Sequence, residues 1–376
     1  MIRLAFCLDS LDIGGTELNA VRTLEALDRS RFAPLLLHFR DGPLLERCRR
    51  AAIPTLRLPL RSLAKPSALI TAGRLVRILR SHRIEVFHAQ DVYSDILGVP
   101  CARVARVPLV VASRRWHEST PRPVHRIASR LGFRLADVVT VNSASTAATM
   151  LAEMRLPPER VVVVSNFVSE AAFEQLSPSS IAEWRARLGL PTDRLVIGCV
   201  ARLVPVKHHD MLLRGFAAMR QATACHLALA GDGPLRAPLE AAAAELGIAG
   251  RVSFLGHVES DRNLNQLFDI VALSSRHEGF PNALVEAMAA ARPVIATAVP
   301  GNVDAVEAGR TGLLVPDSDP TALAAALDDL VANAGLRETL GMQGKARALE
   351  RYRQDAVIGA LSDLYVSRLG AKRQRP

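Results

Sequence analysis

The sequence contains no apolar run near the ~20 residues that a membrane-spanning helix needs, although hydrophobic residues make up 49% of its 376 positions. The first residues, Met1 to Asp9, hold an apolar run that is too short for a signal-peptide core and lacks a small-residue cleavage site. We interpret them as a first buried strand. A chain that is soluble, or attached to a membrane surface from one side, is therefore expected.

Cysteine, tryptophan and tyrosine are scarce. The five cysteines include no C-x-x-C pair and mostly lie in apolar patterns, so we expect reduced core residues of a cytoplasmic protein and neither a disulfide framework nor a metal site. With two tryptophans and three tyrosines, the chain offers few rings on which single-stranded nucleic-acid bases could stack. Nucleic acid is thus not an expected partner.

Acidic residues are under-represented in the first half of the chain. Residues 1–180 carry 25 Lys and Arg against 16 Asp and Glu, whereas residues 181–376 carry 22 against 21. This asymmetry accounts for most of the net charge of +10. It indicates an anionic partner for the first half, either a membrane surface or an acidic acceptor molecule. The alternative is a solvated basic surface without a specific partner.

Short apolar runs alternate with helical patterns along the whole chain. In the first half the predicted strands are 2–8, 33–38, 55–58, 84–88, 109–112, 138–141 and 161–164. In the second half they are 194–200, 226–230, 252–255, 270–273, 293–297 and 312–315. Continuous Val, Ile and Leu runs between helices are typical of parallel sheets covered on both faces. Because the length exceeds what one core usually accommodates, the predicted fold is α/β with two doubly wound, Rossmann-like domains.

The pattern loosens between residues 167 and 191, and we place the division there, with a first domain at 1–172 and a second at 173–355. A detached helical pattern follows at 356–369 and ends in a basic tail that includes Lys372. Doubly wound domains bind ligands at the carboxyl ends of their strands. We expect those ends to face each other across a cleft that holds the active site.

Two glutamates mark the stretch from Arg276 to Met288, where an apolar strand gives way through a polar loop to an amphipathic helix. Glu278 lies in the loop, and Glu286 lies about one turn inside a helix expected to start near Asn282, so both side chains can face one crevice. Backbone N–H groups at the helix start complete an arrangement typical of a polyol and phosphate site. These groups belong to Gly279, Phe280, Asn282 and Ala283. The alternative is two unrelated, exposed carboxylates.

Basic and glycine residues follow other predicted strands. Arg202 and Lys207, between a strand and a helix, could clamp a diphosphate, although basic loop residues are common. Gly231 lies in a tight turn, and Gly14 and Gly15 form a turn that can bring N–H groups close to an anion. Because the dinucleotide fingerprint G-x-G-x-x-G is absent, this turn predicts no nicotinamide or flavin cofactor.

Polar residues gather at two strand ends of the first half. His88 ends one predicted strand. It can be interpreted equally well as a site residue or as a residue that makes structural hydrogen bonds. Arg114, Trp116 and His117 follow the next strand. Further on, four arginines repeat at every fourth position beside an apolar helix face. They are Arg122, Arg126, Arg130 and Arg134, and the apolar residues are Val124, Ile127, Leu131 and Leu135. Such a helix can lie on anionic lipid, or it can present a solvated face.

Taken together, these motifs resemble the retaining GT-B glycosyltransferases of the family-4 type, also described as glycosyl transferases group 1. The likeness covers nearly the whole chain and is strongest in its second half, including 292–297 and 309–315. It rests on motifs in the expected order: Gly14-Gly15-Thr16-Glu17, Ala201-Arg202-Leu203 followed by Lys207, Gly231-Asp232-Gly233-Pro234, and the pair Glu278 and Glu286.

The resemblance implies a UDP-, GDP- or ADP-sugar donor that is bound chiefly by the second domain. Glu286 would bind the ribose hydroxyls, Arg202 and Lys207 the diphosphate, and Glu278 with the loop after it the transferred sugar. Transfer is expected with retention and without a metal, since cations and helix N–H groups can neutralise the departing diphosphate. No cofactor is expected. The last helix, 356–376, is expected to pack on the first domain.

The first domain would hold a glycan or lipid-linked acceptor near His88, Arg114 and Trp116. Many relatives in this family have a histidine where Arg114 stands, so catalytic roles for Arg114 and His117 are hypotheses. The glycine turns at Gly14, Gly15 and Gly231 would help to bind the donor. The leading hypothesis is synthesis of a bacterial envelope glycan, such as lipopolysaccharide or exopolysaccharide. The basic first half and its stripe of four arginines motivate a location at the inner face of the cytoplasmic membrane.

Two other functions remain compatible with these residues. A nucleotide-sugar epimerase of the GT-B type would show a similar layout and bind similar ligands, although the spacing of Glu278 and Glu286 with Arg202 and Lys207 favours the transferase. A non-catalytic protein that binds nucleotide sugars would also keep these residues. Dependence of nucleotide release on an acceptor distinguishes the transferase from both.

Overall fold

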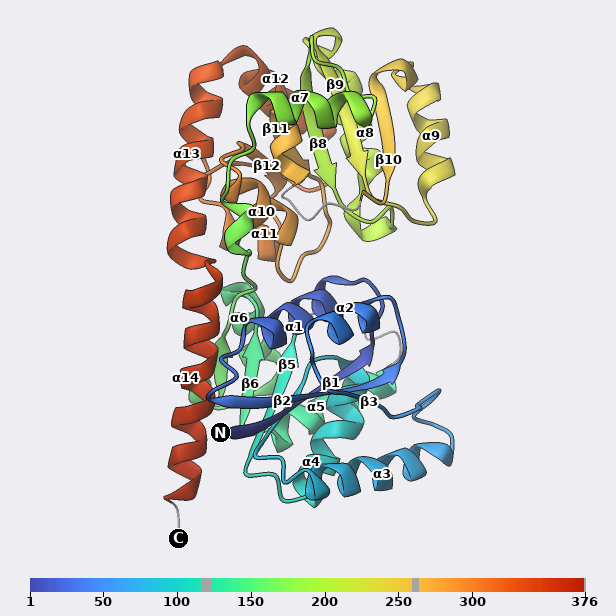
Figure 1. Cartoon of the computed structure of the whole chain (residues 1–376). Helices are drawn as coiled ribbons and strands as arrows, with labels where there is room; N and C mark the ends of the chain where they lie inside the picture. Colours follow the sequence, from blue (N-terminus) through green and yellow to red (C-terminus); the bar gives the residue numbers. More distant parts are fainter. Residues whose placement is uncertain (116–122, 259–263, 375–376) are drawn as a thin grey trace. The chain divides into compact units, whose positions relative to one another are not determined.

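The computed structural model describes residues 1–115, 123–258 and 264–374, which belong to two compact units (Figure 1). Unit 1 comprises Met1–Asn166 and Gln354–Pro376, and unit 2 comprises Phe167–Arg353. The units divide after Asn166, six residues before the division placed at 172/173 from the sequence. Within the described residues, no helix has the length and apolar character to cross a bilayer.

Unit 1 is built on a seven-stranded sheet whose strand pairings are parallel. The strand order is β3-β2-β1-β4-β5-β6-β7. Strands β1 to β3 are added toward one edge of the sheet and β4 to β7 toward the other, and this change of order between β1 and β4 is typical of a doubly wound domain. The central strands are buried along nearly their whole length, which is why they form continuous apolar runs in the sequence. The strands are β1 Ile2–Ser10, β2 Phe32–Arg40, β3 Thr55–Arg57, β4 Val86–Ala89, β5 Leu109–Arg114, β6 Val138–Val141 and β7 Val161–Val163.

Helices connect these strands, and one more returns from the end of the chain. They are α1 Gly15–Ala26, α2 Leu44–Arg50, α3 Ser67–Ser81, α4 Val99–Val104, α5 Pro123–Leu135, α6 Ala144–Met154 and α14 Gln354–Arg373, with short turns η1 Ser94–Gly98 and η2 Pro158–Arg160. α14 docks through Tyr365, which is fully buried and packs edge-on against Phe32 and His88. The last helix therefore belongs to the core of unit 1.

Unit 2 repeats the design on a six-stranded parallel sheet in the order β10-β9-β8-β11-β12-β13. Its strands are β8 Leu195–Val200, β9 Cys225–Ala230, β10 Val252–Gly256, β11 Ile270–Leu273, β12 Val294–Thr297 and β13 Leu313–Val315. Its helices are α7 Pro178–Arg187, α8 His209–Ala218, α9 Arg236–Glu245, α10 Asn282–Ala289, α11 Pro300–Ala305, α12 Pro320–Ala332 and α13 Ala334–Arg351. Asp319 caps α12 by accepting from the N–H groups of Thr321 and Ala322, with Pro320 at the first position.

The two parallel sheets confirm the predicted α/β class, and all five cysteines are buried and free, as expected. Local predictions failed where elements are short. The sequence pattern did not indicate α2 or α11, because helices of seven and six residues show hardly two turns of periodicity. The helical pattern seen at 356–369 extends further in the structure: α14 runs from Gln354 to Arg373, and Lys372 in its basic end is paired with Asp137 at 2.6 Å.

Candidate functional site

The loops after β8 and β11 are tied together at the carboxyl edge of unit 2. Ser274, directly after β11, donates its hydroxyl to the carbonyls of Lys207 (3.1 Å) and His208 (2.9 Å). The backbone N–H of Arg276 donates to the carbonyl of Val206 at 2.9 Å. These bonds bring together two segments that are far apart in the sequence.

Lys207 and Glu278 form an ion pair at this junction. Nζ of Lys207 lies 2.5 Å from Oε1 of Glu278, and the same oxygen accepts from the Ser275 hydroxyl at 2.6 Å. The side chains are 23% and 8% exposed, respectively. Gly301 donates its N–H to the carbonyl of Glu278 at 3.1 Å, and a Cβ at Gly301 would lie only 2.7 Å from that oxygen. The Glu278 carboxylate is thus held in a fixed position, and the Lys207 ammonium neutralises its charge.

Hydroxyl and amide groups at the ends of β11 and β12 support the Glu278 loop. Thr297 donates its hydroxyl to the carbonyl of Ser275, and the fully buried Asn302 donates Nδ2 to the carbonyl of Thr297 at 2.9 Å. Ser274, Ser275 and Thr297 were not among the predicted site residues. Hydroxyl residues directly at the carboxyl ends of predicted strands were the signal that could have identified them.

Helix α10 begins at Asn282, as predicted, and carries the half-buried Glu286. The N–H groups of Gly279, Phe280 and Ala283 make no hydrogen bond within the described parts of the chain, so they can bind an anion. The N–H of Asn282 differs, because it donates to the carbonyl of Phe280 at 3.1 Å. Three of the four predicted donors are therefore open to a ligand in this conformation.

The turns after β8 and β9 touch each other. Gly231 has a φ of 143°, and a Cβ at this position would lie 2.0 Å from the carbonyl oxygen of Ala201, so the contact requires glycine. Arg202 comes next in the chain. Its side chain is exposed and has no partner among the described residues. The structure thus places an unengaged guanidinium and the Lys207 ammonium in the same segment, which follows β8.

In unit 1, Gly14 precedes α1 at the carboxyl edge of the sheet and makes no side-chain cap. The carboxylate of Glu17 lies against this glycine, since a Cβ on Gly14 would be 2.2 Å from Oε2 of Glu17. A donor phosphate at this helix start would meet a like charge unless Glu17 moved. Donor binding by Gly14 and Gly15 stays a prediction.

His88 lies in the core of unit 1. Its Nδ1 is 2.6 Å from the hydroxyl of Tyr365, and its Nε2 is 2.7 Å from that of Ser113 and 3.1 Å from that of Thr140. Burial lowers the pKa of His88 well below its ordinary value, which keeps the ring neutral. Both ring nitrogens lie within hydrogen-bond distance of hydroxyl groups, so the geometry favours the structural interpretation. In this role, His88 links α14 to the sheet through Tyr365.

Arg114 ends β5 and is 4% exposed. Its Nη1 lies 2.7 Å from Oε2 of Glu153 in α6, so the guanidinium is directed toward α6. Trp116 and His117 lie outside the described residues. The acceptor-binding and catalytic roles of these three residues stay predictions.

A cavity of about 320 Å³ opens at the carboxyl edge of unit 1. Its polar lining comes from five segments and comprises Asp9, Arg40, Arg61, Tyr93 and His125. Nδ1 of His125 is buried without a hydrogen-bond partner in the described parts of the chain. Burial raises the pKa of Asp9 to about 6, although the N–H groups of Tyr93 and Ser94 act in the opposite direction. None of these residues stood out in the sequence, because only the fold brings them together.

Two family models match the chain. The model described as Glycosyltransferase Family 4 matches residues 13–171, and the model described as Glycosyl transferases group 1 matches residues 180–347. The second match contains Arg202, Lys207, Glu278 and Glu286.

Curated relatives resemble the chain over most of its length. It is 33% identical over 278 residues to a D-inositol 3-phosphate glycosyltransferase of Stackebrandtia nassauensis. The aligned region covers 69% of this chain and 61% of that relative. It is 31% identical over 325 residues to the GDP-mannose-dependent alpha-(1-6)-phosphatidylinositol monomannoside mannosyltransferase of Mycolicibacterium smegmatis. Here the aligned region covers 80% of this chain and 81% of that relative.

Solved structures share the fold. Anabaena Alr3699/HepE in complex with UDP is similar with a TM-score of 0.87 at 24% identity, covering 97% of this chain and 100% of that chain. The same Anabaena protein in complex with UDP-glucose gives a TM-score of 0.85 at 23% identity, covering 98% and 100%. The lipopolysaccharide outer core galactosyltransferase WaaB gives 0.75 at 18% identity, also covering 98% and 100%.

Proposed function

We propose a sugar transfer for this chain, which belongs to the glycosyltransferases of group 1, family-4 type, and has the GT-B fold. The donor would be a nucleotide-diphosphate sugar, and the acceptor a glycan or a lipid-linked molecule. The observation that carries this proposal is the Lys207–Glu278 pair beside the open N–H groups of the α10 start. The relative that depends on GDP-mannose and the structural neighbour that binds UDP-glucose support the choice of donor.

Four charged residues of unit 2 have a proposed role toward the donor. Arg202 and Lys207 contact the diphosphate, Glu286 accepts hydrogen bonds from the ribose hydroxyls, and Glu278 accepts them from the transferred sugar. Once a diphosphate oxygen shares the ammonium of Lys207, the bond to Glu278 weakens and its carboxylate becomes available to sugar hydroxyls. Binding of the donor would therefore reorganise the Lys207–Glu278 ion pair.

The proposed reaction keeps the anomeric configuration. The bond from the anomeric carbon to the phosphate oxygen breaks, and the nucleoside diphosphate leaves with the bonding electrons. An acceptor hydroxyl forms the new bond on the same face, and its proton passes to the leaving phosphate. Two cations and the N–H groups before α10 offset the growing negative charge, which is the basis for proposing that the reaction needs no metal.

The acceptor would bind to unit 1 in the cavity of about 320 Å³. Arg40, Arg61 and His125 suit an acceptor that carries negative charge, and Tyr93 offers a ring face and a hydroxyl to a sugar. The basic first half also supports the proposal that the enzyme works in the cytoplasm at the inner membrane surface, on a bacterial envelope glycan. Vesicle binding at low salt tests the membrane part by itself.

A panel of UDP-, GDP- and ADP-sugars tests the donor proposal. A ligand present at 100 times its Kd stabilises the native state by about 2.7 kcal/mol, so the matching donor should raise the Tm of unit 2 by roughly 5–10 °C. Glu286→Ala should abolish this shift. Glu338→Ala is the matched control, because it removes an exposed helix carboxylate of the same unit and should leave the shift intact.

Product analysis separates the transferase from the alternatives. Nucleotide release that requires an acceptor, with a retained anomeric configuration by NMR and undiminished turnover in EDTA, is the expected result. Isomerised donor in the absence of acceptor would instead establish an epimerase. If no nucleotide sugar shifts the Tm, or if Glu286→Ala and Glu338→Ala behave alike, the assigned donor site is wrong.

A further inference from the structure

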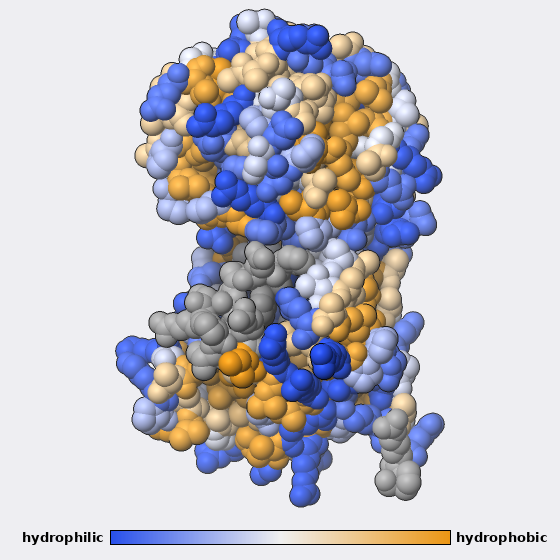
Figure 2. All heavy atoms as spheres, turned by 180° about the vertical axis from the view of Figure 1, so that it is seen from behind, coloured by the Kyte–Doolittle hydropathy of each residue, from blue (hydrophilic) through white to orange (hydrophobic). Residues whose placement is uncertain are grey.

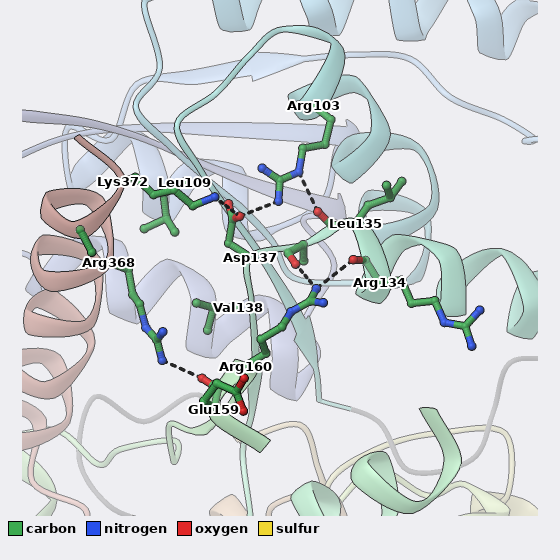
Figure 3. A pocket seen from close by; sticks show the side chains of 12 residues that line it. Arg103, Leu109, Arg134, Leu135, Asp137, Val138, Glu159, Arg160, Arg368 and Lys372 are labelled. Atoms are coloured by element: carbon green, nitrogen blue, oxygen red, sulfur yellow. Dashed lines mark hydrogen bonds and ion pairs between the residues drawn. The ribbon is translucent and has the colours of Figure 1, made fainter. Parts of the chain in front are cut away.

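A second cavity of unit 1 lies at the opposite edge of its sheet, where β5 and β6 begin (Figure 3). Its volume is about 440 Å³. The walls come from the ends of α4 and α5, the η2 turn and the last turns of α14. The length of the strands separates this cavity from the carboxyl edge, so the proposed sugar transfer does not use it.

The lining of this cavity is strongly basic. It contains five cationic side chains and two carboxylates, which gives an excess of positive charge that attracts anions. The cations are Arg103, Arg134, Arg160, Arg368 and Lys372, and the carboxylates are Asp137 and Glu159. Figure 3 shows Arg368 and Lys372 reaching in from α14, whereas the Arg134 side chain extends from α5 in a direction away from Arg160 and Arg368.

Two of these arginines neutralise the end of α5. Arg160 donates Nη2 to the carbonyls of Phe133 (3.1 Å) and Arg134 (2.9 Å), and Arg103 donates Nε to the carbonyl of Leu135 at 2.7 Å. Open carbonyls at a helix C-terminus would repel an anion. Because these carbonyls are occupied, the repulsion is reduced, and the two guanidinium groups are held in place by backbone atoms.

Asp137 is neutralised in the same way. Arg103 Nη2 and Lys372 Nζ lie 2.8 Å and 2.6 Å from its Oδ1. Burial acts to raise the pKa of Asp137, but hydrogen bonds from these two cations outweigh it and lower the pKa. The other three cations, Arg134, Arg160 and Arg368, have no acidic partner among the described residues. Arg368 donates Nη2 to the carbonyl of Glu159 at 2.7 Å, and the exposed Arg134 side chain has no partner in the described parts of the chain.

We propose that this cavity binds a phosphate group through Arg160 and Arg368, toward which the exposed Arg134 side chain can turn. The planar guanidinium presents paired N–H groups that match phosphate oxygens. Arg160 and Arg368 each use only Nη2 for their backbone bonds, so their other N–H groups can donate to the ligand. Their positions are already fixed, and binding therefore loses little side-chain freedom.

The phosphate can belong to a free phosphate ester or to a phospholipid headgroup. Two exposed apolar side chains of α5 are relevant to a phospholipid headgroup. Ile127 and Leu131 are 65% and 57% exposed, and Leu131 lies one turn before Arg134 on the same helix face. Figure 2 shows hydrophobic and hydrophilic side chains side by side on the back of unit 1. A headgroup in the cavity would leave acyl chains near these residues, whereas a free ester has no need of them.

Hydrogen exchange read by mass spectrometry tests the site with inorganic phosphate as the probe. Phosphate should slow exchange in peptides that cover 133–138 and 366–373 of the full-length protein. The double variant Arg134→Gln with Arg368→Gln should raise the apparent Kd for this protection about tenfold or more. The matched control, Arg74→Gln with Arg77→Gln, removes two exposed charges from α3 of the same unit and should bind phosphate like the wild type. Circular dichroism checks that both variants are folded.

Sedimentation with vesicles distinguishes the two sources. Binding to phosphatidylglycerol vesicles but not to phosphatidylcholine vesicles, lost in the cavity double variant and weakened by Leu131→Ser, assigns the phosphate to a lipid. Phosphate protection without vesicle binding assigns it to a free ester, and both results support the site. The proposal is overturned if phosphate protects neither segment, or if the two double variants lose phosphate and vesicle binding equally.

Discussion

The ion pair of unit 2 offers the sharpest test of the site. We consider Lys207→Met, Glu278→Gln and the double variant. Lys207→Met leaves a carboxylate that is 8% exposed with Ser275 as its remaining side-chain donor. Glu278→Gln instead leaves an ammonium that is 23% exposed and can turn toward water. The two single changes should therefore have unequal effects on stability.

The magnitude follows from burial. Leaving a buried acceptor without its charged partner costs about 1–3 kcal/mol, and hydrogen bonds to charged groups contribute about 1.5–3 kcal/mol. Because Lys207 is partly exposed, solvent screening reduces the value, and we expect about 2 kcal/mol for Lys207→Met and about 1 kcal/mol for Glu278→Gln. A loss of 2 kcal/mol lowers the Tm of a unit this size by roughly 4–8 °C. The double variant should recover part of this loss, with a coupling energy of about 1 kcal/mol.

Tryptophan fluorescence can report unit 2 alone. The chain has two tryptophans, and Trp184 lies in α7 of unit 2. In a Trp116→Phe background, thermal unfolding followed by Trp184 gives the Tm values of the four proteins in the cycle. A coupling energy below about 0.3 kcal/mol, or a larger loss from Glu278→Gln than from Lys207→Met, would refute the inference that Lys207 holds a buried carboxylate in place.

Three other changes probe separate features. The pKa of Asp9 is about 6 in the folded chain against an ordinary 3.8, so folding takes up a proton at Asp9 between these values, and the contribution of Asp9 to the stability of unit 1 falls by roughly 2–3 kcal/mol as the pH rises from about 4 to about 6. Asp9→Asn should reduce that fall in urea titrations at several pH values. Tyr365→Phe leaves Nδ1 of the buried His88 without its partner at 2.6 Å, and should cost about 1–3 kcal/mol, seen as faster hydrogen exchange in α14; unchanged exchange would contradict the docking role. Gly231→Ala places a Cβ against the carbonyl of Ala201, and should cost roughly 2 kcal/mol or more and weaken the donor-induced rise in Tm, whereas wild-type values for both would contradict the close approach of the two turns.

The sequence alone was sufficient for the fold class and for part of the site. Apolar strands buried on both faces produce runs of Val, Ile and Leu that are visible without a structure, and they indicated both parallel sheets. The start of α10 at Asn282 was predictable for a similar reason, because a polar loop and the onset of helical periodicity are adjacent in the chain. Features encoded within about ten residues could be predicted.

Only the tertiary structure decided which charges meet. Lys207 and Glu278 were selected separately, for the diphosphate and for the sugar, and their contact depends on the bonds that Ser274 makes between two loops. His88 shows the same limit: its pattern allowed a site residue or a structural hydrogen bonder, and the choice came from Tyr365, a residue near the other end of the chain. The two cavities of unit 1 are assembled from four or more segments each. Sequence periodicity reports local burial, whereas contacts between distant segments depend on how the sheets order their strands.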